Sequence, residues 1–329
     1  LRRAVVRQLF RLAIYKGEGM GAEHRFGGAW TEQKLAAISY YAQFYTGALR
    51  GRPDAPFRFD LWYIDAFAGS GERTEKVEEG GLFEGKPAET VEVQLDGSAK
   101  RAMAVSPPFK HLVFMEPDPR RYEALKALEG SDSRVRCVQG DANLALPDLF
   151  SQPEWQTKGA GKGLQRGLVF LDPYGMQVPY STLELLAATK RVDVFYLFPI
   201  EAVTRQLARD FRAVDQHKQS ALDAVLGGPD WREEFYEELQ HQTVFGDTEV
   251  HRRRTATRRE VESWFQKRLS GTFSFVSPAL PLGDGNLQKF SLFLAVANDS
   301  VKAVQLAKNG VRDMLKQQEY AASRRRSCL

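Results

Sequence analysis

Short apolar runs alternate with helical patterns through the middle of this chain. Five runs have the length and apolar content of buried strands, at 61–64, 112–115, 135–138, 168–171 and 192–198. Polar or helical sequence separates them, and a clear helical stretch lies at 182–187. This alternation predicts an α/β fold in which helices cover both faces of a mostly parallel sheet.

Further elements are expected at both ends of this core. A helix capped by Thr31 is predicted ahead of the first strand, from apolar residues at helical spacing: Leu35, Ile38, Tyr41, Tyr45 and Leu49. The runs 273–280 and 290–297 flank the turn residues 283–286 and predict a terminal antiparallel hairpin. The expected sheet therefore has seven strands, and a helix follows it over the apolar positions between 301 and 314.

The chain divides by pattern into six segments. They are a leader at 1–19, an N-terminal helical segment at 20–58, the α/β core at 59–200, an insertion at 201–270, a hairpin and helix that complete the core at 271–316, and a basic tail at 317–329. The insertion is predicted to be helical, because apolar residues recur on one helical face: Val203, Leu207, Phe211, Val214, Leu222 and Val225, then Trp231, Phe235 and Leu239.

Composition places the chain among ordinary folded proteins. Hydrophobic residues make up 43% and charged residues 27%, which excludes a disordered, collagen-like or coiled-coil protein. No apolar run approaches the roughly 20 residues of a membrane span, so we expect no membrane partner. Cys137 and Cys328 are too few for a disulfide framework or a tetrahedral metal site. A cytoplasmic protein without a metal ion is expected.

The net charge of +4 comes from the first nineteen residues. They contain five of the 46 basic residues and one of the 42 acidic residues, so that 41 of each remain from Met20 onward. The codons of residues 16–19 begin with two purines, as a ribosome-binding site does, and we expect residues 1–19 to be translated upstream sequence ahead of a start at Met20. An Arg-rich targeting segment and an amphipathic helix are the alternatives. Net charge then gives no argument for an anionic partner.

Candidate chemistry follows the predicted strands, because ligands of open α/β sheets bind at the carboxyl ends of the strands. After the first strand, Asp65 can hold an ammonium or hydroxyl group, and Gly69 and Gly71 let the backbone approach a ligand. A plain tight turn explains these glycines equally well. Thr74 stands where the dinucleotide fingerprint requires its third glycine, which disfavours an NAD dehydrogenase.

The next two strands also end in acids. Glu116 can accept hydrogen bonds from both hydroxyls of a ribose, with helix capping by Asp118 as the structural alternative. Asp141 can accept from an adenine amino group, or belong to a solvated turn.

The motif after the fourth strand, Asp172-Pro173-Tyr174-Gly175, is the most specific of the set. Because Pro173 has no N–H, the acidic side chain and the nearby carbonyl are left as acceptors, and Tyr174 can stack on a planar group. These features suit the exocyclic amino group of a base. The alternative is a turn with Tyr174 packed into the core.

Two charged segments stand out. Five arginines without an intervening acid suit contacts to RNA or DNA phosphates: Arg252, Arg253, Arg254, Arg258 and Arg259. A solvated loop, or pairing with Glu233, Glu234, Glu237 and Glu238, explains them equally well. Seven glutamates make residues 72–97 unsuited to a phosphate backbone, and we interpret that segment as a solvated lid.

Four motifs on successive strands resemble, in their order, those of class I S-adenosylmethionine-dependent methyltransferases. They are Asp65-x-Phe67-x-Gly69-x-Gly71, Glu116, Gly140-Asp141 and Asp172-Pro173-Tyr174. More narrowly, Trp30-Thr31 with Lys34-Leu35, and the segments 63–71, 96–98 and 171–175, resemble the three-Cys-motif partner protein (TcmP) family over about residues 25–315. Two positions depart from the relatives. Ala99 replaces a common proline, and the usual Asn/Asp-Pro-Pro-Tyr/Phe tetrad of amino-methyltransferases lacks one proline here.

The resemblance implies a Rossmann-like fold and S-adenosylmethionine as cofactor. The implied cofactor contacts are Asp65, Phe67, Gly69, Gly71, Glu116 and Asp141. Asp172, Pro173 and Tyr174 would handle the amino group of a nucleic-acid base during methyl transfer, with Lys34 and Ser98 as candidate substrate contacts. The shortened tetrad keeps an alternative open: a non-catalytic or cofactor-binding partner subunit in a complex with a three-Cys-motif protein.

Overall fold

The structure, a computed structural model, describes residues 29–52, 58–81, 86–156, 164–242, 248–284 and 287–327. The leader predicted at 1–19 lies outside these residues, and the segment boundaries remain predictions. The chain separates into a smaller unit that contains Thr74–Gln94 and a larger unit formed by Gly28–Arg73 and Leu95–Leu329. Each unit is described by itself.

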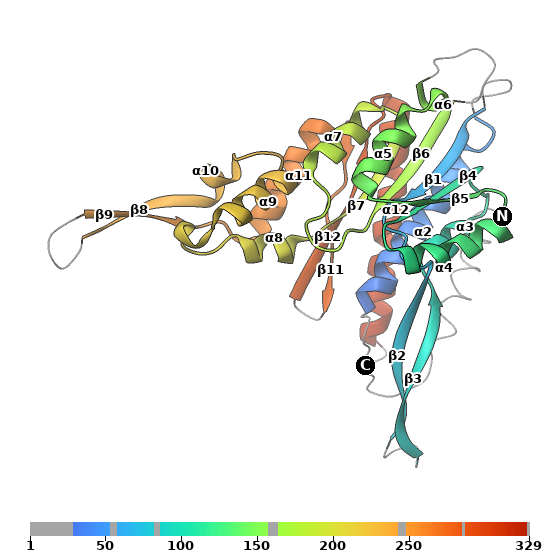
Figure 1. Cartoon of the computed structure of the whole chain (residues 1–329), viewed down its shortest axis with the longest axis horizontal. Coiled ribbons are helices and arrows are strands. Elements are labelled where there is room, and N and C mark those ends of the chain that lie inside the picture. The colour runs from blue at the N-terminus through green and yellow to red at the C-terminus, as the bar shows by residue number, and fades with distance from the viewer. Residues whose placement is uncertain are drawn as a thin grey trace. The chain divides into compact units, whose positions relative to one another are not determined.

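An eight-stranded sheet forms the centre of the larger unit (Figure 1). Its strands run in the order β10 (Phe275–Val276), β12 (Leu287–Val296), β7 (Val192–Phe198), β6 (Gln165–Leu171), β1 (Asp60–Asp65), β4 (His111–Glu116) and β5 (Val135–Gln139), with β11 (Leu280–Asp284) also paired to β12. The pairs from β7 to β5 are parallel, and β12 is antiparallel to β7. The predicted α/β fold with a mostly parallel sheet and a terminal antiparallel hairpin is confirmed.

The eighth strand results from a break in the predicted run 273–280. At the break, Ser277 donates its N–H to the Leu294 carbonyl at 2.8 Å, and its hydroxyl accepts the Leu294 N–H at 2.9 Å. Pro278 follows and has no N–H for a ladder hydrogen bond. The edge strand therefore stops at β10 and resumes as β11.

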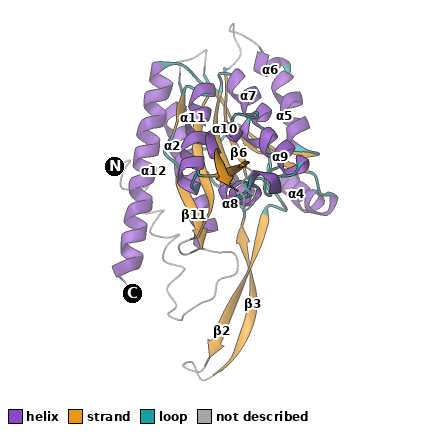
Figure 2. Ribbon diagram, turned by 90° about the vertical axis from the view of Figure 1, so that its left-hand side faces the viewer, coloured by secondary structure: helices purple, strands orange, loops and turns teal. Residues whose placement is uncertain are grey.

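Side chains alternate between two apolar layers, one on each face of the sheet. Tyr63 and Phe114 point into one layer, and their neighbours Ile64 and Met115 point into the other. Helices α2 (Ala29–Leu49) and α12 (Val301–Ser327) lie on one side, and α5 (Ala142–Ser151) and α7 (Tyr180–Ala188) lie on the other (Figure 2). Burial on both faces explains why the parallel strands are continuously apolar rather than alternating.

Two helix ends differ from the sequence prediction. Helix α2 already includes Ala29, so that Thr31 lies inside the helix and does not cap it. The ring of Trp30 packs on Phe290 at 5.0 Å between centroids, which gives the first turn a tertiary partner. Helix α12 continues to Ser327, because the sequence predicted as a basic tail contains good helix formers and no stop signal.

In the smaller unit, β2 (Glu72–Gly81) and β3 (Lys86–Asp96) pair as a two-stranded sheet. The sequence analysis interpreted this segment as a solvated lid because of its glutamates. β-branched and polar residues alternate along 90–94, a pattern typical of a strand. That pattern was given less weight than the many glutamates of the segment.

The insertion is only partly helical. It contains α8 (Ile200–Gln206), a 3-10 turn at Phe211–Ala213, α9 (Gln216–Leu226), α10 (Trp231–Phe235), the antiparallel pair β8 (Tyr236–Gln242) and β9 (Thr248–Arg254), and α11 (Arg258–Thr272). The helical prediction is wrong for β8, which includes Leu239. Glu237 and Glu238 lie opposite Arg253 and Arg252 in the strand register, and such cross-strand opposite charges stabilise a hairpin.

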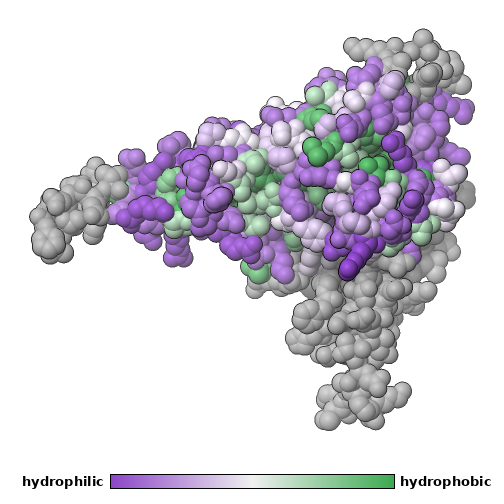
Figure 3. All heavy atoms as spheres, in the orientation of Figure 1, coloured by the Kyte–Doolittle hydropathy of each residue, from purple (hydrophilic) through white to green (hydrophobic). Residues whose placement is uncertain are grey.

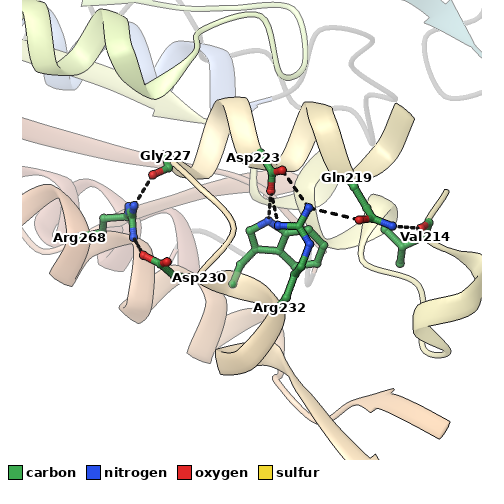
Figure 4. A network of polar contacts seen from close by, with 8 residues as sticks. Val214, Gln219, Asp223, Gly227, Asp230, Arg232 and Arg268 are labelled. Carbon is green, nitrogen blue, oxygen red and sulfur yellow. Dashed lines mark hydrogen bonds and ion pairs between the residues drawn. The ribbon is translucent and has the colours of Figure 1, made fainter. Parts of the chain in front are cut away.

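Two arginines hold the helices of the insertion together (Figure 4). Arg232 donates to both oxygens of Asp223 at 2.7 and 2.8 Å, and Trp231 Nε1 donates to the same carboxylate at 2.8 Å. Arg268 donates to Asp230 at 2.7 Å and to the Gly227 carbonyl. The insertion is therefore an internally bonded part of the larger unit.

Hydrophilic side chains predominate over the start of the β8–β9 hairpin in Figure 3, and apolar side chains reach the surface around α5 and α7. None of the helices within the described ranges is both long enough and apolar enough to cross a membrane.

Asp193 is a buried carboxyl group at the amino end of β7, and it makes stability depend on pH. The Tyr41 hydroxyl donates to its Oδ2 at 2.8 Å. Burial raises the pKa of Asp193 to about 7, although the Tyr41 hydrogen bond and the Arg166 charge oppose the shift. The folded chain then binds a proton that the unfolded chain releases near pH 4, so that the free energy of unfolding falls as pH rises from about 4 to 7.

We expect Asp193→Asn to raise the free energy of unfolding at pH 8 by up to about 4 kcal/mol, because it removes a buried charge and keeps an acceptor for Tyr41. Urea denaturation at pH 4.5 and pH 8 measures the change, with Asp148→Asn on the exposed surface of α5 as control. Equal or lower stability of Asp193→Asn at pH 8 would contradict the expectation.

Candidate functional site

The loops after β1 and β5 are hydrogen-bonded to the last residues of β4 and β6 at the carboxyl edge of the sheet. Ala66 donates its N–H to the Phe170 carbonyl, and Ala68 donates to the Met115 carbonyl, both at 3.0 Å. Gly140, after β5, donates to the Glu116 carbonyl at 3.3 Å. The four acids predicted from the strand ends, Asp65, Glu116, Asp141 and Asp172, therefore lie along one edge.

Asp65 is fully buried at the end of β1. Its Oδ1 accepts the Phe67 N–H at 3.2 Å, whereas Oδ2 has no hydrogen-bond partner of normal geometry among the residues that the structure describes. Burial raises the pKa of this carboxyl group to about 7, and the Asp172 charge adds to the rise. The approaching Ser98 hydroxyl, the Phe67 N–H and the Lys34 charge oppose it. A buried oxygen without a partner is costly unless a ligand donor completes it.

The two glycines after Asp65 differ in their surroundings. Both have positive φ, +62° at Gly69 and +78° at Gly71. A Cβ atom on Gly69 would meet nothing within 4 Å, but one on Gly71 would lie 3.0 Å from Leu128 Cδ1 and 3.4 Å from Leu125 Cδ1. Gly71 is therefore required for packing against α4 (Pro119–Ser131), and the space beside Gly69 is open for a ligand.

We expect Gly71→Ala to lower the free energy of unfolding by about 2–3 kcal/mol, from left-handed strain together with the contact on Leu128. Gly69→Ala has the same strain without the contact and should cost about 1 kcal/mol. Thermal denaturation of both variants measures the difference. Equal losses would show that the contact with Leu128 relaxes without cost.

Glu116 and Asp141, two acids of the predicted site, also accept backbone N–H groups near the starts of α4 and α5. Glu116 is buried, and its Oε1 accepts the Asp118 N–H at 3.0 Å. Asp118 is the N-cap of α4, as the structural alternative proposed. Asp141 caps α5 by accepting the Asn143 N–H at 2.8 Å, and its side chain is exposed.

Lys34 of α2 forms an ion pair with Asp172 at the end of β6. The distance from Nζ to Oδ2 is 2.5 Å. Lys34 is only 4% exposed, and its ammonium group lies 5.3 Å and 5.8 Å from the ring centres of Trp30 and Phe170. Both residues were predicted from the sequence as site residues, but not as a pair, because 138 positions separate them. Oδ1 of Asp172 accepts no hydrogen bond from the residues that the structure describes.

Tyr174 is 67% exposed, so the alternative that packed it into the core is wrong. Its neighbour Pro173 is the buried member of the motif. Arg121 of α4 donates to the Tyr174 hydroxyl at 3.3 Å, with its guanidinium carbon 5.4 Å from the ring centre. Arg121 was missed as a site residue, since no sequence signal relates the first turn of α4 to the end of β6.

The five arginines of 252–259 lie on β9 and at the start of α11, and three of them make internal hydrogen bonds. Arg252 donates to Glu233 at 2.8 Å, which is one of the predicted pairings. Arg254 donates to the Thr204 and Leu207 carbonyls at 2.9 and 2.7 Å, and Arg258 to the Gln288 carbonyl at 2.5 Å. Arg253 and Arg259 are exposed.

Ser98 begins α3 (Ser98–Met103) and approaches Asp65. Among the described residues, no three His, Cys, Asp or Glu side chains are grouped as a metal site requires.

No family model matches this chain, and no curated protein is significantly similar to it. Solved structures with partial likeness include a Legionella pneumophila protein of the DUF519 family, with 14% identity over 72% of this chain and 92% of that one and a TM-score of 0.35. An S-adenosylmethionine-dependent methyltransferase from Clostridium acetobutylicum shares 8% identity over 90% and 99%, with a TM-score of 0.32. The N-methyltransferase NodS from Bradyrhizobium japonicum shares 10% over 70% and 100%, with a TM-score of 0.27.

Proposed function

We propose that this protein is an S-adenosylmethionine-dependent methyltransferase of the three-Cys-motif partner family that modifies an amino group of a nucleic-acid base. The observation that carries the proposal is the buried Asp65 carboxyl group. Its Oδ2 accepts no hydrogen bond from the described residues, and its loop leaves open space at Gly69. An ammonium donor fits that oxygen. Glu116 would take ribose hydroxyls, and Asp141 the adenine amino group.

When bound, S-adenosylmethionine supplies a methyl group made electrophilic by its sulfonium. The protein would contribute to the reaction by binding the acceptor and orienting it toward that methyl group. Lys34 occupies Oδ2 of Asp172 at 2.5 Å, which leaves Oδ1 to accept an N–H of the acceptor amine and later its proton. The exposed Tyr174 ring would stack on the base.

The Lys34–Asp172 pair also favours the second candidate, a cofactor-binding partner subunit of a three-Cys-motif protein. That carboxylate is the counter-charge of Lys34, which is only 4% exposed, so the pair has a stabilising role in the fold. This candidate keeps the cofactor contacts of Asp65 and Glu116 and assigns Asp172 a structural role.

Calorimetric titration with S-adenosylmethionine tests the shared step, and labelled methyl transfer onto total RNA, DNA and a three-Cys-motif protein separates the two candidates. Transfer to a base in RNA or DNA supports the first. Cofactor binding without transfer, together with capture of the partner protein, supports the second. The absence of cofactor binding contradicts the proposed enzyme.

A further inference from the structure

We infer that Arg121, together with its neighbour Arg120, contacts the phosphate backbone of a single-stranded nucleic acid and positions the Tyr174 ring that receives the acceptor base. The inference deepens the proposed function and rests on it. It also moves the nucleic-acid contact away from Arg252, Arg254 and Arg258.

The contact between α4 and the end of β6 places a guanidinium group beside an exposed aromatic ring. Arg121 Nη1 lies 3.3 Å from the Tyr174 hydroxyl, and the guanidinium carbon lies 5.4 Å from the ring centre. The ring remains 67% exposed. A cation beside an aromatic face is a stabilising arrangement, and the remaining ring surface is available to a planar base.

The backbone of Tyr174 is held independently of Arg121. Its N–H donates to Gln177 Oε1 at 3.1 Å, and the Gln177 carbonyl accepts from Asn143 Nδ2 of α5 at 2.9 Å. Removal of the Arg121 side chain therefore leaves the loop in place and frees the ring. Arg121 acts as a positioning residue for Tyr174 as well as a phosphate contact.

Arg120 and Arg121 make no salt bridge within the described part of the chain, and both are exposed. The nearby Asp118 carboxylate accepts their backbone N–H groups at 3.0 and 2.9 Å. Toward the residues that the structure describes, Arg121 uses one of its five guanidinium N–H donors, in the bond to Tyr174. Planar donors without a carboxylate partner suit phosphate oxygens.

The arginines of 252–259 contrast with this pair. Arg252, Arg254 and Arg258 use their guanidinium donors on Glu233 and on backbone carbonyls. A phosphate could engage them only at the expense of these bonds. The ligand at Tyr174 must moreover be unpaired at the acceptor base, because a base inside a duplex cannot stack on a protein ring. The geometry therefore points to a single strand.

Fluorescence anisotropy with labelled 12-nucleotide single-stranded RNA and DNA at several salt concentrations tests the inference. Arg121→Ala is expected to weaken binding five- to thirtyfold and to reduce the slope of log affinity against log salt by about 0.7, the value for one phosphate contact on a single strand. Arg50→Ala, at an exposed arginine directly after α2, is the matched control and should change neither quantity. Arg121→Lys should restore the slope.

The positioning role has its own readout. In a double-mutant cycle, the losses of strand affinity in Arg121→Ala and Tyr174→Ala should be non-additive. Arg121→Ala already weakens the stacking of the base on the Tyr174 ring, and Tyr174→Ala removes that stacking. Additive losses would overturn the positioning role. An unchanged salt slope in Arg121→Ala, or a larger loss in Arg50→Ala, would overturn the phosphate contact.

Failure of this inference differs from failure of the proposed function. Calorimetric titration of Arg121→Ala with S-adenosylmethionine should give the wild-type affinity. If the wild-type chain binds the cofactor but neither labelled strand, the inference is wrong and the cofactor proposal stands. If it binds no cofactor, the proposed function fails at its first step.

Discussion

Asp65→Asn is expected to weaken S-adenosylmethionine binding a hundredfold or more. The carboxyl group is fully buried, and its Oδ2 has no hydrogen-bond partner in the described part of the chain. Replacement of a buried anionic acceptor by an amide removes a charge-assisted hydrogen bond and leaves the ligand ammonium group without its counter-charge, at a cost of about 3 kcal/mol or more. Calorimetric titration at pH 8 measures the loss.

The same variant should be more stable than the wild type. Burial raises the pKa of Asp65 to about 7. The free energy of unfolding of the wild type therefore falls as pH rises from about 4 to 7, because the folded chain must give up a proton that the unfolded chain has already released. Asp65→Asn has no carboxyl group to ionise. At pH 8 its free energy of unfolding should exceed that of the wild type by a few kcal/mol, about 4 at most. Cofactor affinity of the wild type should fall below pH 7, as the carboxyl group protonates. Wild-type affinity in Asp65→Asn would contradict the cofactor role, and Asp148→Asn serves as the control.

Asp172→Asn is expected to lower methyl transfer by about 10²–10⁴-fold with cofactor affinity retained within a few-fold. Its Oδ1 is the acceptor that the proposed mechanism assigns to the amine proton, and an amide cannot take that proton. Single-turnover transfer of labelled methyl groups to the nucleic acid identified as substrate measures the rate. Unchanged turnover would refute the assigned role.

Asp172→Asn also removes the counter-charge of Lys34, which is 4% exposed. We expect a loss of about 2 kcal/mol in the free energy of unfolding, less than for a fully buried pair because the Asp172 side chain is 25% exposed. The double variant Lys34→Gln with Asp172→Asn restores a neutral pair. It should recover stability without activity, which separates loss of chemistry from loss of the fold.

Part of the candidate site could be predicted because it follows from the order of the strands. Parallel strands bring their carboxyl ends to one edge, so that an acid after each apolar run is enough to place Asp65, Glu116, Asp141 and Asp172 together. The cap at Asp118 could likewise be anticipated from its position ahead of a helix. These features depend on short stretches of sequence.

The missed features depend on contacts between distant segments. The pairing of β8 with β9 places Glu237 opposite Arg253, and a glutamate-rich stretch that includes Leu239 is equally compatible with a helix until its partner strand is known. In the same way, β10 ends because Ser277 bonds to Leu294 on the neighbouring strand. Secondary structure at such positions is decided by tertiary pairing rather than by propensity.

By itself, the sequence determined the α/β plan, the strands of the sheet and the acids that follow them, because periodicity and strand-end position are local properties of the chain. Only the tertiary structure decided that Lys34 neutralises Asp172, that Tyr174 is exposed beside Arg121, and that Asp65 Oδ2 is left without a partner. Each of these facts depends on distances between side chains from different elements and on how completely water is excluded from them. Packing sets both quantities, and no local pattern encodes them.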